Sequence, residues 1–108
     1  MLSKILKNII NSSFKKINFG SIKITYPDKS FYIYGDGNNY AELEIHSWKA
    51  ILLCITKGDI GLAESYFKNY LSTSDVSKLM IFFSQNLNEI KTLAGGRKYL
   101  KIFYHLKH

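Results

Sequence analysis

Cysteine is nearly absent from this 108-residue sequence, in which Cys54 is the only thiol. No disulfide can form within the chain, and Cys54 lies in the apolar run 50–55, where we expect it to pack as a small hydrophobic residue. A single free thiol fits a reducing compartment, so we predict a cytoplasmic protein. The apolar runs are also far shorter than the roughly 20 residues that a membrane-spanning helix needs.

The sequence also lacks the spacing of a metal site and of a nucleotide-binding loop. The histidines are widely separated, at His46, His105 and His108, and no C-x-x-C or H-E-x-x-H pattern is present. The segment 58–61 lacks the GK[ST] ending of a phosphate loop, and the segment 35–37 lacks the third glycine of a dinucleotide fingerprint. We therefore predict turns at both segments, no metal and no cofactor.

Acidic residues are missing from both ends of the chain. Residues 1–23 and 91–108 contain basic residues but neither Asp nor Glu, and the formal net charge is +7. Basic ends can meet anionic lipid, nucleic acid or an acidic protein, and charge alone does not choose among them. Aromatic residues alternate with lysines in 98–105, as in some base-stacking surfaces. Since no RNA-recognition or DNA-binding motif accompanies them, we predict no nucleic-acid partner.

Hydrophobic periodicity predicts an α+β fold. Apolar residues recur every three or four positions in 1–19, which is typical of an amphipathic helix. Apolar and polar residues alternate in 22–26 and 41–45, which indicates half-buried strands. Proline starts a turn at 27–30, and residues 31–34 are predicted to form the return strand of a hairpin. Because short loops join these strands in succession, we predict an antiparallel meander sheet.

Helices are predicted to cover this sheet. One begins near Trp48, with Ser47 as its cap, and ends at Gly58; a second opens at Asp59 or Gly61. A third follows the cap at residues 72–75, and its predicted apolar stripe is Val76, Leu79, Met80 and Phe83. A final helix is predicted over 89–107. We divide the single domain into an N-terminal helix (1–19), an α+β body (20–88) and a C-terminal connector (89–108).

Two segments carry a family resemblance. Residues 41–48 read AELEIHSW and residues 58–67 read GDIGLAESYF. Together they resemble the N-terminal, non-catalytic domain of the cyclopropane-fatty-acyl-phospholipid synthase family, whose pattern is approximately G-D-L-G-x-G-E-A-Y. The chain matches this pattern at Gly58, Asp59, Gly61, Glu64 and Tyr66. It differs from the pattern at Ile60, Ala63 and Ser65, and it lacks the tryptophan and glycine that usually follow.

The resemblance implies a lipid-related role without catalysis. The family's S-adenosylmethionine-dependent methyltransferase domain lies outside these 108 residues, so we expect no enzymatic activity from the chain by itself. The order of elements also resembles the sterol-carrier type of lipid-binding domain, in which helices and an antiparallel sheet enclose an apolar cavity. We predict a domain that binds phospholipid or fatty acyl chains and presents them to a separate methyltransferase chain.

Candidate residues follow from this interpretation. Helical residues that should cover the sheet are predicted to face lipid: Leu53, Phe67, Leu71, Met80 and Phe83. Lysines of the N-terminal helix are predicted to meet an anionic membrane at its inner face: Lys4, Lys7, Lys15 and Lys16. The apolar side of that helix could equally pack on the protein's own sheet.

Two further alternatives stay open. Glu64 and Tyr66 have either a structural role, which we favour, or contact a lipid headgroup. Glu42 and Glu44 are interpreted as the solvated side of a strand rather than a carboxylate pair. The alternative function is a docking or dimerisation module, including a homodimer, in which protein instead of lipid covers the apolar surfaces.

Overall fold

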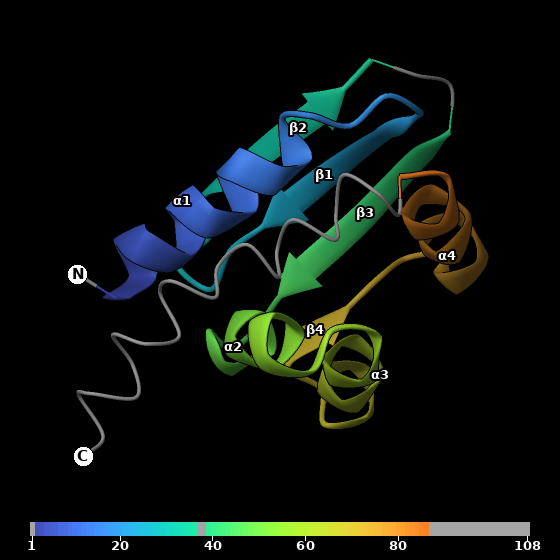
Figure 1. The fold of residues 1–108 in the computed structure, drawn as a ribbon. Coiled ribbons are helices and arrows are strands. Elements are labelled where there is room, and N and C mark those ends of the chain that lie inside the picture. The colour runs from blue at the N-terminus through green and yellow to red at the C-terminus, as the bar shows by residue number, and fades with distance from the viewer. Residues whose placement is uncertain (1, 37–38, 87–108) are drawn as a thin grey trace.

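A computed structural model describes residues 2–36 and 39–86 of the chain (Figure 1). Its elements follow in the order α1 (Leu2–Phe14), β1 (Ser21–Thr25), β2 (Phe31–Gly35), β3 (Tyr40–Ile45), α2 (Lys49–Lys57), α3 (Asp59–Phe67), β4 (Leu71–Ser72) and α4 (Val76–Gln85). The predicted α+β class is confirmed. The helix predicted over 89–107 and the connector 89–108 lie outside the described residues.

The sheet is mixed, so the predicted antiparallel meander is wrong. Its strand order is β2-β1-β3-β4, with β1 antiparallel to β2 but parallel to β3. After β2 the chain crosses to the other side of β1. There β3 pairs with β1, and Ile24 lies opposite Leu43. Because β1 becomes a central strand, its backbone groups are paired on both sides. This topology gives no support to the sterol-carrier likeness.

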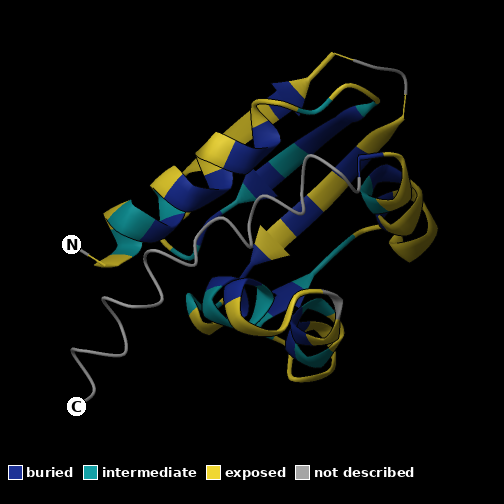
Figure 2. Ribbon diagram, viewed as in Figure 1, coloured by how far each residue is buried: buried dark blue, intermediate teal, exposed yellow. Residues whose placement is uncertain are grey.

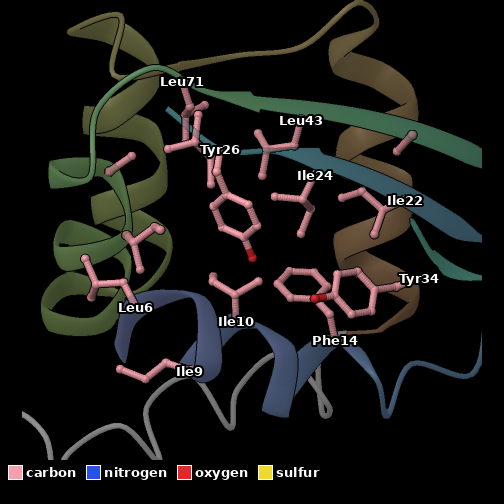
Figure 3. Packing of buried hydrophobic residues seen from close by; sticks show 14 of the residues in the cluster. Leu6, Ile9, Ile10, Phe14, Ile22, Ile24, Tyr26, Tyr34, Leu43 and Leu71 are labelled. Carbon is pink, nitrogen blue, oxygen red and sulfur yellow. The ribbon is translucent and has the colours of Figure 1, made fainter. Parts of the chain in front are cut away.

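One face of the sheet forms the core with α1. Ile22 and Ile24 of β1 and Leu43 of β3 are buried on this face, and the buried side of α1 packs against them (Figures 2 and 3). The α1 residues that fill this layer are Leu6, Ile9, Ile10 and Phe14. The apolar side of α1 is therefore used by the protein's own core, which answers the question that the sequence left open.

Helix α4 packs beside α1 on the same face. The ring of Phe82 stacks on that of Phe14 at a centroid distance of 6.2 Å, and Leu79 is also buried. The predicted α4 stripe was therefore partly misplaced, since Val76 and Met80 are exposed. The rotation of α4 is set by the aromatic cluster beneath it, a long-range contact that local periodicity does not contain.

The buried side chain of Asn86 forms hydrogen bonds between the end of α4 and the segment before β1. The Asn86 Oδ1 atom accepts hydrogen bonds from the backbone N–H groups of Asn18 at 3.0 Å and Phe19 at 3.1 Å. Its Nδ2 group donates to the carbonyl oxygens of Phe19 at 2.8 Å and Phe82 at 3.0 Å. One side chain thus satisfies four backbone groups between α4 and the segment before β1.

Candidate functional site

The family-like motif forms the tight connection between α2 and α3. Gly58 ends α2 with φ 58°, a conformation that glycine adopts without a side-chain clash. At Gly61 an added Cβ atom would lie 1.9 Å from the carbonyl oxygen of Leu53. Only a residue without a side chain lets α3 approach α2 this closely. Two glycines of the motif therefore have a structural explanation.

Ser65 links α3 to the residue that precedes strand β4. Its buried hydroxyl donates to the carbonyl oxygen of Gly61 at 2.7 Å, and its own carbonyl accepts from the N–H of Tyr70 at 2.8 Å. The carbonyl of Tyr70 in turn accepts from the N–H groups of His46 at 2.8 Å and Ser47 at 3.1 Å. The motif consequently sets β4 beside β3, a short strand that sequence reasoning missed.

Glu64 is held by lysines. Its carboxylate lies 3.4 Å from Lys57 Nζ and 4.0 Å from Lys68 Nζ. These contacts supply a structural role for the carboxylate at the α2–α3 connection, while lipid headgroup contact stays a prediction. The side chain of Asp59 lies outside the described part of the structure.

An apolar surface remains exposed on α3. Ile60 is 72% exposed and Phe67 is 81% exposed, and both lie on one side of the helix with the exposed Ala63 between them. We call these residues the α3 surface. The ring of Tyr66 meets that of Phe67 edge-on at 6.1 Å. Figure 1 shows α3 at one end of the sheet. Within the part of the chain that the structure describes, Ile60 and Phe67 are exposed to solvent.

The predicted lipid-facing residues do not converge on one place. Phe67 and Met80 are exposed on α3 and α4, Leu71 is buried in the core, and Leu53 and Phe83 are half-buried. They were chosen as apolar residues of helices, and the sequence does not show toward which side each helix turns them. Lipid contact by these five residues stays a prediction.

The candidate lysines in α1 and just after its end at Phe14 divide into two groups. Lys7 Nζ lies 2.6 Å from Asp28 Oδ2 and 2.9 Å from Ser30 Oγ, so its charge is paired within the protein. The hydrogen bond from Lys7, assisted by those from Ser30, lowers the pKa of Asp28 to about 2. The remaining candidate lysines, Lys4, Lys15 and Lys16, are exposed. Lys7 is therefore the α1 lysine least suited to bind a phosphate group.

A polar groove of about 370 Å³ lies on the face of the sheet opposite α1. Its lining residues are Lys23, Thr25, Glu42, Leu43, Glu44, Ser72, Thr73 and Ser74. Glu42 and Glu44 are exposed there, which confirms that they belong to the solvated side of a strand.

A serine, a histidine and a glutamate meet at the edge of this groove. His46 Nε2 lies 2.7 Å from Ser72 Oγ, and His46 Nδ1 lies 3.7 Å from Glu44 Oε2. In a nucleophile–base–carboxylate triad the second contact is a hydrogen bond that orients the imidazole, and 3.7 Å is too long for one. We interpret the group as a surface polar cluster. Sequence reasoning missed it because the pairing of β3 with β4 was not predicted.

Metal and membrane-spanning features are not found in the described ranges. Among residues 2–36 and 39–86, no three His, Cys, Asp or Glu side chains are grouped to hold a metal ion. None of the helices in the same part of the chain has the length and apolar character to cross a bilayer.

Comparisons with protein-family models, with curated proteins and with solved structures gave no match to this chain. The resemblance to the synthase family therefore remains a prediction that depends on the motif residues themselves.

Proposed function

We propose that this chain is a non-catalytic domain that binds an anionic lipid surface. The observation that carries the proposal is the α3 surface, because large apolar side chains are exposed there on a helix anchored by the motif. Ile60 and Phe67 are exposed, and Glu64 of the same helix is paired with Lys57 and Lys68. Exposed apolar residues beside lysines are typical of segments that lie in a membrane interface.

The mechanism is insertion of the α3 surface combined with charge attraction. Ile60 and Phe67 enter the boundary between headgroups and acyl chains. Lys57 and Lys68 share the single carboxylate of Glu64, so their two positive charges leave a net positive charge beside the lipid phosphates. The exposed residues Lys4, Lys15 and Lys16 and the net charge of +7 add long-range attraction to an anionic surface. We assign membrane insertion to α3 and not to α1, because the apolar side of α1 is buried in the core.

The finer part of the proposal follows the family resemblance. The domain holds phospholipid acyl chains at the inner face of a membrane and presents them to a methyltransferase chain that binds S-adenosylmethionine. The α2–α3 connection supports it, because Gly58, Gly61 and Ser65 fix α3 rigidly against α2 and β4. A methyltransferase chain of this family should copurify with the domain, and no binding between the two chains would contradict this part.

Vesicle sedimentation tests the lipid surface. The double variant Ile60→Ser/Phe67→Ser should lose at least about tenfold in binding to anionic vesicles, since burying one such side chain contributes about 1.5–3 kcal/mol and tenfold corresponds to ~1.4 kcal/mol. The matched control is Val76→Ser/Ile81→Ser, which removes two apolar residues of similar type from the exposed side of α4.

The control should pellet like the unmodified protein, and binding of both should weaken as salt is raised. The proposal fails if the unmodified chain does not pellet with anionic vesicles, or if the α3 and α4 variants lose binding equally.

A further inference from the structure

Strand β2 is an edge strand with one side open. In the strand order β2-β1-β3-β4, its only partner among the described strands is β1. The N–H of Tyr26 donates to the carbonyl of Ser30 at 2.8 Å and continues the β1–β2 register. Antiparallel pairs alternate between residues that exchange hydrogen bonds and residues that do not. Phe31 and Ile33 therefore direct their backbone N–H and C=O groups toward the open edge, and Gly35 ends the strand with φ 80°.

This edge lacks the usual protection against pairing. Proteins commonly place lysine, proline or a bulge on an exposed edge strand. The sequence of β2 is FYIYG, without a charged residue or proline, and its register with β1 is continuous from Thr25 to Ser21. Phe31, Tyr32 and Ile33 are 55%, 61% and 55% exposed. An extended, uncharged and apolar edge of this kind favours the addition of another strand.

We propose that β2 pairs with β2 of a second copy of this chain, antiparallel about a two-fold axis at Ile33. The open backbone groups of Ile33 then meet those of Ile33 in the copy, and Phe31 lies beside the end of the copy's strand. Ile33 faces Ile33, and Phe31 faces Gly35, so that a large ring covers a residue without a side chain. The result is a continuous sheet of two copies, with both α1 helices on the same face.

Charge complementarity favours a second copy over an unrelated segment. In this register Asp36 of one copy is aligned with Ser30 of the other, beside the exposed Lys29 of the same turn. The other charge of that turn, Asp28, is already paired with Lys7 at 2.6 Å. Each end of the pairing therefore brings an acid of one copy next to a lysine of the other. The strand itself carries no charge that would repel its copy.

The contact is small, so the dimer is expected to be weak. A pair of five-residue strands buries less than the total of about 1,200 Å² that stable interfaces reach at the low end. Disulfide trapping suits such a contact because it captures a minor or short-lived dimer. In the background Cys54→Ala, the variant Ile33→Cys should form a disulfide-linked dimer under mild oxidation.

The matched control is Tyr32→Cys, which lies on the same strand and is similarly exposed. In the proposed register the two Ile33 positions have Cα atoms about 5.5 Å apart, within the range for a disulfide. The two Tyr32 positions are offset along the strands and lie about 8 Å apart, beyond that range. Ile33→Cys should therefore cross-link at least about tenfold faster, since only its geometry permits the bond.

A second variant tests the contact without a covalent bond. Ile33→Lys places like charges opposite each other at the two-fold axis and should raise the dissociation constant of the dimer at least about tenfold in sedimentation equilibrium. Ile81→Lys, on the exposed side of α4, should leave it unchanged. Equal cross-linking of the two cysteine variants would overturn the proposal. So would a monomeric Ile33→Cys chain, which is the result expected if another segment of the same chain covers β2.

Discussion

Helices α1 and α3 both carry large apolar residues close to lysines, yet they direct these residues differently. The apolar side of α1 lies against the sheet, where Phe14 and Ile10 are buried. In α3 the close approach to α2 is made at Gly61, and the large residues Ile60 and Phe67 face outward. An amphipathic pattern therefore shows that a helix has an apolar side, but the partner of that side depends on the rest of the fold.

The largest expected difference between the two helices is in stability. Phe14→Ala should lower the free energy of unfolding by about 3–5 kcal/mol, because it removes a buried ring that contacts Tyr34, Phe82 and Phe83. Phe67→Ala should change it by no more than about 0.5 kcal/mol, because the ring is exposed. Urea denaturation of both variants checks this contrast. Similar losses in the two variants would mean that α3 also buries its apolar side.

The next expected effect is a loss of stability at Gly61, where α3 approaches α2 closely. An alanine normally stabilises a helix by about 0.5–1 kcal/mol relative to glycine. Gly61→Ala should instead destabilise the protein by about 1–3 kcal/mol, because its Cβ would collide with the backbone of Leu53. The reverse change at the exposed Ala63, Ala63→Gly, should cost only the ordinary helix propensity. A stabilised Gly61→Ala variant would contradict the close approach of α2 and α3.

The smallest expected effect is on the pKa of Asp28, and it distinguishes Lys7, which is paired with Asp28, from the exposed Lys4. The pKa of Asp28 is lowered from 3.8 to about 2 by hydrogen bonds from Lys7 and Ser30. Because this folded-state pKa is depressed, the contribution of the pair to stability is present above pH 3.8 and is lost as the pH falls through about 2. Lys7→Met should raise the pKa of Asp28 toward 3.8 in an NMR titration. Lys4→Met should leave the pKa of Asp28 at about 2.

Local sequence signals predicted most of the elements correctly. Three features depend on neighbouring residues alone: the alternation in β1 and β3, the proline turn after Tyr26, and the end of α2 at Gly58. The cap of α4 was also predicted, and Asp75 Oδ1 accepts from the N–H of Lys78 at 3.1 Å. These features follow from backbone preferences within a few residues, which a single sequence contains.

The candidate site was predicted less well because it depends on side-chain direction. The motif residues Gly58, Gly61 and Glu64 do lie together, since they share one helix connection. The predicted lipid-facing residues were taken from several elements, and their exposure differs from the buried Leu71 to the exposed Phe67. Which side of each helix is covered depends on contacts between distant segments, such as that of Phe14 with Phe82.

The amino-acid sequence by itself determined the type and approximate place of most helices, strands and turns, although not of β4, because hydrophobic period, glycine and proline act over a few residues. Tertiary structure decided that β3 pairs in parallel with β1, that β2 lies at the edge, and that α1 rather than α3 buries its apolar side. These outcomes follow from competition between segments for the same sheet face and the same backbone partners. Such competition is resolved only when the whole chain packs.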